Sequence, residues 1–271
     1  MARLQARAVS DVGAYRTGNQ DSAFTAHWGA AVADGVGGGP AGDLASAALV
    51  HRLVAAVQDA GSWGAVTAEQ LLTGIRVANW DLRAHVLQDP ALEGMATTFT
   101  GLFTAPADQL VLTHTGDSRA YLLRAGEMTR ETRDDSYVQS LIDRGLMTDH
   151  EAFSHPHRNV ITASLHGRDD DVITLAVVDA IAGDRWLLCS DGVTDYLREE
   201  DVAVLLTSGS PADSADAIVR VALAAGSRDN VTAVVCDVTD AADAGSHSAD
   251  DVHPAFYGAA ADRFNERLDR A

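Results

Sequence analysis

One stretch constrains this chain more than any other: an apolar run that ends in a carboxylate and then in glycines. It spans Ala30–Gly39 and contains Asp34. Small or absent side chains after an aspartate leave its carboxylate and the nearby backbone carbonyls open to a ligand. Three further aspartates, Asp117, Asp191 and Asp229, border other apolar runs. Four carboxylates at the ends of strands predict a site for hard cations that prefer oxygen ligands.

Each of these aspartates also has an ordinary structural interpretation, because aspartate is common in tight turns. The glycine-rich stretch Gly37–Gly42 likewise matches the GxGxxG pattern of dinucleotide-binding folds. That fold needs a second strand that ends in an acid about 20 residues later. Asp59 stands at that distance, but it ends a predicted helix and another helix follows. A nucleotide-binding oxidoreductase is therefore the least favoured alternative.

The composition excludes several classes of partner. The net charge is −19 and all basic side chains are Arg, which argues against nucleic acid as a partner. The same charge would repel a phosphorylated substrate unless cations occupy the site. No apolar run is long enough to span a membrane and the N-terminus is too polar for a signal peptide, so we expect a cytoplasmic protein without a membrane partner. Cys189 and Cys236 lie within apolar runs and are predicted to be buried free thiols.

Helix and strand signals are clustered along the chain. Strands are predicted over residues 2–10 and 22–33, and two long helices follow, the second opened by a Thr67–Gln70 capping box. Short apolar runs separated by tight turns over residues 97–124 predict a meander of antiparallel hairpins. A polar, His-rich excursion over about residues 136–171 precedes further strands and a helix. Clustered strands and clustered helices favour antiparallel sheets covered by helices.

Six short motifs that contain Asp, Gly, Arg or Thr follow one another along the chain. They are Ser10–Gly13 with Arg16–Asp21, Val32–Gly38, Gly94–Thr98, Gly116–Arg119, Ser190–Val193 and Arg228–Thr232. In this order and spacing the chain resembles the metal-dependent type 2C (PPM) Ser/Thr protein phosphatases in their compact bacterial form, from about residue 3 to 238. The resemblance implies an α+β fold: a four-layer αββα sandwich of two antiparallel β-sheets flanked by helix pairs.

The resemblance also implies how metal ions would be held. Asp34 would bridge two Mn²⁺ or Mg²⁺ ions, and the backbone carbonyl of Gly35 would complete the coordination of one. Asp191 and Asp229 would hold the other ion. Asp117 would share a third, looser ion with Asp191. Divalent cations of this kind are suited to sites built from a few carboxylates and water.

Further residues are implied to serve the substrate and the metal waters. Arg16 would clamp the substrate phosphate through its planar guanidinium, and Asp11 and Asp21 would orient metal-bound waters. Eukaryotic members of the family often carry a His two residues after the bridging aspartate, whereas Val36 stands there in this chain. The general acid is therefore left open between a metal-bound water and a histidine of the excursion, namely His155, His157 or His166.

The implied function is hydrolysis of phosphoserine and phosphothreonine in proteins by a metal-activated water, in opposition to a Ser/Thr protein kinase. Phosphorylated proteins are the implied partners, and we expect a monomer. Residues 1–240 would form the catalytic domain, with the excursion over about 136–171 as a flap beside the site, and 241–271 would be a loose acidic tail. The alternative is a non-catalytic, phosphatase-like module that binds phosphoproteins. It ranks lower because all four acids at the metal positions are present.

Overall fold

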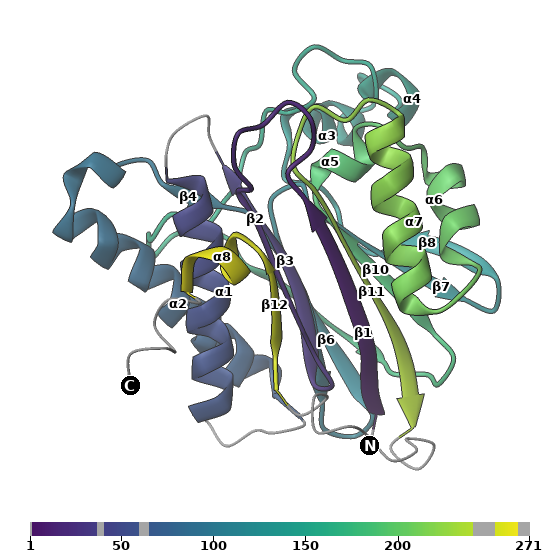
Figure 1. Cartoon of the computed structure of the whole chain (residues 1–271), viewed down its shortest axis with the longest axis horizontal. Helices are drawn as coiled ribbons and strands as arrows, with labels where there is room; N and C mark the ends of the chain where they lie inside the picture. The colour runs from purple at the N-terminus through teal and green to yellow at the C-terminus, as the bar shows by residue number, and fades with distance from the viewer. Residues whose placement is uncertain (1, 37–40, 60–64, 241–252, 265–271) are drawn as a thin grey trace.

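The computed structural model describes residues 2–36, 41–59, 65–240 and 253–264. Two antiparallel β-sheets stack face to face at the centre of the molecule, and helices cover the outer face of each sheet (Figure 1). The predicted four-layer αββα sandwich is confirmed. Within the described ranges, no helix is both long and apolar enough to cross a membrane.

The first sheet contains five strands in the spatial order β1–β11–β10–β7–β8. Their bounds are β1 (Ala2–Asp11), β7 (Arg119–Arg124), β8 (Glu127–Arg130), β10 (Arg185–Cys189) and β11 (Val231–Asp240). Strands β1 and β11 pair over ten residues, from Ala2 opposite Asp240 to Asp11 opposite Val231. This register places the end of β1 beside the segment that leads into β11. Cys189 and Cys236 lie in β10 and β11 and are buried free thiols, as predicted.

The second sheet has the order β12–β2–β3–β5–β6–β9, with the short β4 also paired to β3. Its strands are β2 (Asp21–Ala26), β3 (Gly29–Val36), β4 (Ala96–Thr97), β5 (Phe99–Ala105), β6 (Gln109–Thr115), β9 (Thr174–Asp179) and β12 (Ala255–Gly258). The prediction of one strand over residues 22–33 is wrong, because β2 and β3 form a hairpin that turns at His27 and Trp28. The two turn residues, His27 and Trp28, are not the Gly, Pro, Asn or Asp typical of turns. Trp28 is almost fully buried, so an apolar residue occupies the turn and the sequence does not indicate it.

Helices segregate to the two outer faces. Helices α1 (Gly42–Asp59), α2 (Ala68–Gln88) and α8 (Ala259–Phe264) lie on the seven-stranded sheet, and α5 (Asp191–Thr194), α6 (Glu199–Leu206) and α7 (Pro211–Ala224) lie on the five-stranded sheet. The predicted Thr67–Gln70 capping box opens α2. The excursion carries α3 (Tyr137–Asp143) and α4 (Asp149–Ala152), and a short 3₁₀ helix, η1 (Pro90–Leu92), follows α2.

The C-terminal segment departs from the expected loose tail. Residues of β12 pair antiparallel with β2 and extend the sheet, with Gly258 opposite Ser22. In α8, Ala259 and Ala260 are buried against the apolar layer beneath α1. The acidic composition predicted disorder, but this segment has small and aromatic side chains that bury apolar surface. Residues 241–252 and 265–271 of the predicted tail lie outside the described residues.

Candidate metal centre

A pocket of about 170 Å³ collects most of the predicted site residues. Six of them line it together: Arg16, Asp34, Gly35, Asp117, Asp191 and Asp229. The remaining lining residues are Gln20, Val36, Thr98, Asn159, Ile161 and Asn230. The glycine-rich turn over residues 37–40, which gave the dinucleotide-like pattern, lies outside the described residues.

Sheet topology explains why acids so distant in sequence meet. Asp34 is near the end of β3, opposite Asp21 of β2. Asp117 stands in the turn between β6 and β7, Asp191 starts α5 directly after β10, and Asp229 precedes β11. Because β7, β10 and β11 are neighbours in one sheet and β3 lies in the facing sheet, the ends of these strands bring the four carboxylates to one end of the sandwich.

The backbone around Asp34 is held from both sides. Its N–H donates to the Thr98 hydroxyl at 3.0 Å, and its carbonyl accepts from the Thr98 N–H at 2.8 Å and the Thr97 hydroxyl at 2.9 Å. Gly35 is pressed against the start of α1, where an added Cβ would stand 2.3 Å from the carbonyl oxygen of Gly42. Only glycine fits there, which agrees with a position whose backbone faces the pocket.

Asp21 supports the site from behind. It is buried, and its carboxylate accepts hydrogen bonds from the hydroxyls of Ser190 at 2.8 Å and Thr232 at 2.7 Å. Burial raises the pKa of Asp21 to about 6 despite these two bonds. Asp11, in contrast, is exposed at the end of β1 and accepts from the Gly13 N–H at 2.7 Å. Neither acid lines the pocket, but Asp21 lies opposite Asp34 in the β2–β3 hairpin.

Arg16 reaches the pocket from the loop between β1 and β2. Its guanidinium donates to Asp229 Oδ2 at 2.6 Å, while the side chain remains 43% exposed. Val36 lines the pocket at the position where eukaryotic relatives often carry His. Among the described residues no histidine lines this pocket. The histidines of the excursion have other neighbours: His155 and His157 lie against Tyr137, and His166 pairs with Asp171.

The electrostatics of the pocket favour a cation. Burial, together with repulsion between neighbouring carboxylates, raises the pKa of Asp34 and Asp191 well above the ordinary value, and raises that of Asp117 to about 7. Asp191 Oδ1 is buried and has no hydrogen-bond partner among the described residues. Within the described part of the chain, no three His, Cys, Asp or Glu side chains converge closely enough to form a ready ligand set. The acids thus share one pocket, in which the Arg16 contact with Asp229 and the charge of Arg119 near Asp117 offset only part of their repulsion.

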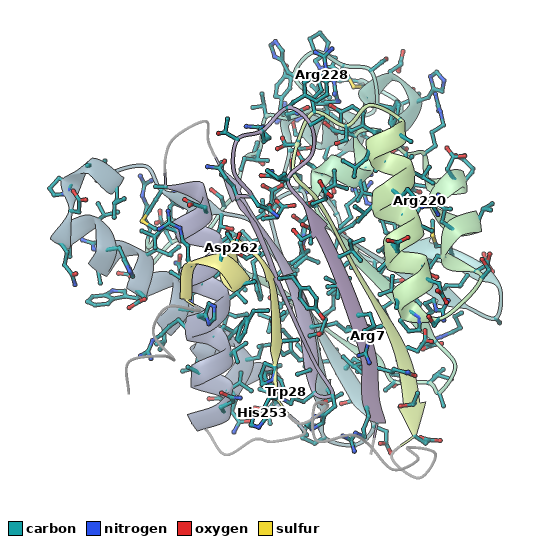
Figure 2. The ribbon with its side chains drawn as sticks, viewed as in Figure 1. Arg7, Trp28, Arg220, Arg228, His253 and Asp262 are labelled. Atoms are coloured by element: carbon teal, nitrogen blue, oxygen red, sulfur yellow. The ribbon has the colours of Figure 1, made fainter. Side chains whose placement is uncertain are left out.

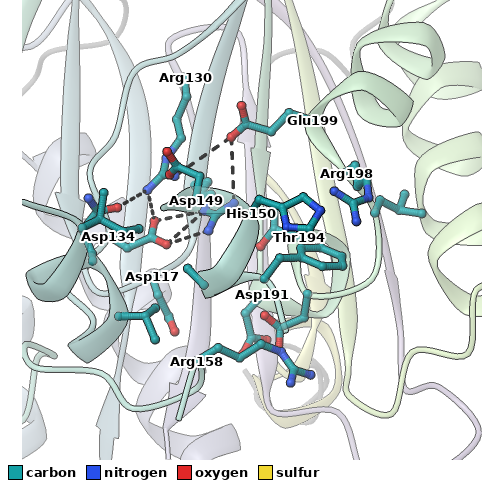
Figure 3. A pocket seen from close by; sticks show the side chains of 18 of the residues that line it. Asp117, Arg130, Asp134, Asp149, His150, Arg158, Asp191, Thr194, Arg198 and Glu199 are labelled. Atoms are coloured by element: carbon teal, nitrogen blue, oxygen red, sulfur yellow. Dashed lines mark hydrogen bonds and ion pairs between the residues drawn. The ribbon is translucent and has the colours of Figure 1, made fainter. Parts of the chain in front are cut away.

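A larger cavity of about 330 Å³ adjoins the first and shares Asp117 and Asp191 with it (Figure 3). Asp134 accepts hydrogen bonds there from Arg119 at 2.8 Å and Arg130 at 2.7 Å, and Glu199 stands 4.0 Å from each arginine. Arg119 belongs to the Gly116–Arg119 motif, but no role was predicted for it or for Asp134, Arg130 and Glu199. These contacts join β7, the segment after β8 and the start of α6, so no local sequence pattern indicates them.

Two other site residues were also missed. Asp195 lies one helical turn after Asp191, its charge raises the pKa of Asp191, and its carboxylate accepts from Arg158 at 3.0 Å. The four-residue spacing from Asp191 could have indicated it, since residues at i and i+4 share a helix face. Thr98 was quoted within a motif but given no task, although it fixes the backbone of Asp34.

The chain is similar to bacterial protein phosphatases. Residues 16–220 match the family model described as protein phosphatase 2C. The Ser/Thr protein phosphatase PstP of Mycobacterium tuberculosis is 43% identical over 237 residues, which are 88% of this chain but only 45% of that protein. The protein phosphatase PhpP of Streptococcus pneumoniae is 33% identical over 249 residues, covering 86% of this chain and 96% of PhpP. The chain thus spans about half the length of PstP and nearly all of PhpP.

Solved structures agree in fold. A crystal structure of the M. tuberculosis PstP phosphatase matches with a TM-score of 0.81 and 40% identity, covering 88% of this chain and 100% of that chain. A structure of the PstP catalytic domain in complex with two manganese ions matches with the same TM-score and identity, covering 89% of this chain and 100% of that chain.

Proposed function

This chain belongs to the protein phosphatase 2C family, and we propose that it is a metal-dependent phosphatase of phosphoserine and phosphothreonine in proteins. The pocket that unites four aspartates with Arg16 is the observation that carries the proposal. PstP and PhpP, the relatives described above, are named as protein phosphatases. We further propose that it acts as a monomer in the cytoplasm, on a phosphorylated Ser/Thr protein kinase or that kinase's substrates.

We assign two Mn²⁺ or Mg²⁺ ions to the pocket. Asp34 would contact both, the Gly35 carbonyl would complete one, and Asp191 with Asp229 would hold the other. Asp117 would share a third ion with Asp191. The unpartnered Asp191 Oδ1 and the mutual repulsion of the acids support this assignment, since a divalent cation would relieve both. The manganese-bound PstP catalytic domain is a relative with this cofactor.

The remaining roles in catalysis are assigned to residues of the chain. When bound, the two divalent cations would offset the charge of the phosphate and lower the pKa of a water between them. Arg16, which already reaches Asp229, would turn its free N–H groups to the phosphate oxygens and orient the ester for in-line attack. Asp21, fixed by hydrogen bonds from Ser190 and Thr232, would orient metal-bound waters from beneath the pocket. Val36 cannot donate a proton and, among the described residues, no histidine lines the pocket, so of the two predicted general acids, a water and a histidine, we assign protonation of the leaving alkoxide to water.

The proposal is tested with p-nitrophenyl phosphate and phosphothreonine peptides. Hydrolysis should require added Mn²⁺ or Mg²⁺ and should stop in excess chelator. Asp34→Ala and Asp229→Ala should each lower kcat/KM by at least about a hundredfold, a typical loss when one group that stabilises transition-state charge is removed. Both variants should retain the circular dichroism spectrum of the wild type and lose Mn²⁺ binding by calorimetry.

Two results would contradict the proposal. Full activity in excess chelator would exclude the metal mechanism. A folded, Mn²⁺-loaded wild-type protein that hydrolyses no phosphopeptide but binds it would instead support a non-catalytic module.

A further inference from the structure

Two loops are joined at the mouth of the pocket by Asn230. Its side-chain amide donates to the carbonyls of Val12 at 3.0 Å and Gly18 at 3.1 Å, and its side-chain oxygen accepts from the Gln20 N–H at 2.8 Å. Gly13 lies so close to the second loop that an added Cβ would stand 2.6 Å from the Asp229 carbonyl oxygen. The loop over residues 12–20 and the loop over residues 227–230 are therefore fixed relative to each other.

This junction sets two exposed side chains against each other. The Arg228 guanidinium carbon lies 5.5 Å from the centroid of the Tyr15 ring, within the range of a cation–π contact. Tyr15 is 63% exposed and Arg228 is also exposed. Figure 2 shows Arg228 at the same end of the molecule as the excursion with α3 and α4. The pair is therefore accessible beside the pocket.

The sequence neighbours of this pair belong to the candidate site. Arg16 follows Tyr15, Asp229 follows Arg228, and both neighbours line the pocket. Arg16 is bound to Asp229 at 2.6 Å, whereas Arg228 forms no ion pair with any residue in the described part of the chain. In a protein with a net charge of −19, Arg228 is thus a cation that no carboxylate of the described residues pairs with, beside a site proposed to bind phosphate.

The chemistry of the pair suits an anion. Stacking on the ring orients the planar guanidinium and leaves its N–H edges available for a carboxylate or a phosphate. Because both side chains are exposed, the stack adds little to the stability of the fold. We propose that Tyr15 and Arg228 form a subsite for a second anionic group, close in sequence to the phosphorylated residue that is hydrolysed. This inference rests on the proposed phosphatase function and adds a substrate preference to it.

The test compares peptides with one phosphothreonine that differ only in flanking residues. One set is neutral, a second carries a single Glu at each flanking position in turn, and a third carries a phosphoserine at each of the same positions, with loss of the phosphothreonine phosphate followed by mass spectrometry. For each variant, kcat/KM is divided by the value for p-nitrophenyl phosphate, so that a general loss of activity cancels. The wild type should prefer one or more acidic peptides by about three- to tenfold, the scale of an exposed charge-assisted contact.

The decisive variant is Arg228→Gln, and the matched control is Arg220→Gln. Arg220 lies on α7, well apart from Arg228 in Figure 2, and is also exposed; its Nε lies 3.7 Å from Asp216 Oδ2. Arg228→Gln should remove the preference and Arg220→Gln should keep it. Arg228→Glu should reverse it, so that a peptide with a flanking Arg becomes the better substrate. The preference should also weaken at high salt.

Tyr15 is a positioning residue, and its role is separable from a merely structural one. Tyr15→Phe should retain the preference because the ring is kept, whereas Tyr15→Ala should reduce it. The effect should appear in KM for the acidic peptides and not in kcat, since the subsite would contact a flanking residue of the peptide and not the reacting bond.

Each outcome has a defined meaning. Activity on all substrates without a preference, or equal effects of Arg228→Gln and Arg220→Gln, would overturn the subsite while leaving the phosphatase function intact. A preference for the phosphoserine peptides alone would assign the subsite to a second phosphate, and a preference for both acidic sets would assign it to either anion. Absence of hydrolysis with every substrate would instead refute the phosphatase function.

Discussion

The buried carboxylates of the pocket lower the stability of the folded protein when no cation is bound. Asp117 is buried, and its pKa is raised to about 7 by burial and by the charges of Asp134 and Asp195. Asp34 and Asp191 have pKa values raised well above the ordinary value for the same kind of reason. The residues that we propose to bind a cation thus make the metal-free protein less stable near neutral pH, and cation binding to the native state should restore that stability.

A pH series on the metal-free protein tests this conclusion. Between the ordinary pKa of 3.8 and the folded value of about 7, the folded state keeps a proton on Asp117 that the unfolded chain has lost. The free energy of unfolding should therefore fall as the pH rises through this window. Asp117→Asn should reduce the slope and raise Tm at pH 7 by several degrees, at about 2–4 °C per kcal/mol.

The measurement is thermal unfolding in excess chelator, and the control is Asp216→Asn, because Asp216 is exposed on α7. A wild-type Tm that rises with pH over the same window would contradict the assignment. Added Mn²⁺ should raise the Tm of the wild type more than that of Asp117→Asn or Asp34→Ala.

At the scale of helices and strands, an element could be predicted from the sequence when neighbouring residues determine it, and not when contacts distant in sequence do. The α2 capping box and the hairpins after residue 97 depend on neighbouring residues, and both are visible in the sequence. The β2–β3 hairpin is not, because its turn is packed in the core around Trp28. The acids of the site could be identified from their positions at the ends of apolar runs. The roles of Asp11 and Asp21 in orienting metal-bound waters stay predictions, because neither acid lines the pocket.

The Asp134 network illustrates a contact between elements with consequences for stability. Asp134 is largely buried and joins Arg119 of β7 to Arg130 of β8 in the cavity of Figure 3. Asp134→Ala would leave two partly buried guanidinium groups without their main partner. We expect it to lower the free energy of unfolding by about 3 kcal/mol, measured by urea denaturation.

A matched control separates this network from surface ion pairs. Asp216→Ala breaks an exposed pair with Arg220 and should cost less than about 0.5 kcal/mol. Equal losses for the two variants would show that the Asp134 contacts add nothing beyond surface electrostatics.

At the scale of the whole molecule, the sandwich is closed by its C-terminal segment. Strand β12 covers the edge of the seven-stranded sheet at β2, and α8 packs on α1. Gly258, between them, has φ +63° and approaches the Asp21 carbonyl so closely that an added Cβ would stand 2.2 Å from it. The sequence predicted a loose tail because its composition is acidic and small. Only the tertiary fit to β2 and α1 gives Ala259 and Ala260 a place to be buried.

This arrangement predicts that undocking α8 disturbs the site from a distance. Ala260 is 1% exposed, so Ala260→Asp would bury a charge without a partner and should lower the free energy of unfolding by about 2–4 kcal/mol. Hydrogen exchange should accelerate in β2, because loss of β12 leaves its edge amides unpaired. Since β2 begins at Asp21, which binds Ser190 and Thr232 beside the acids, Mn²⁺ affinity should fall as well.

Ala261→Asp, one residue later and only partly buried, should change exchange in β2 and Mn²⁺ affinity little. If Ala260→Asp destabilises the protein while exchange in β2 and Mn²⁺ affinity stay as in the wild type, the C-terminal segment stabilises α1 alone and has no influence on the site.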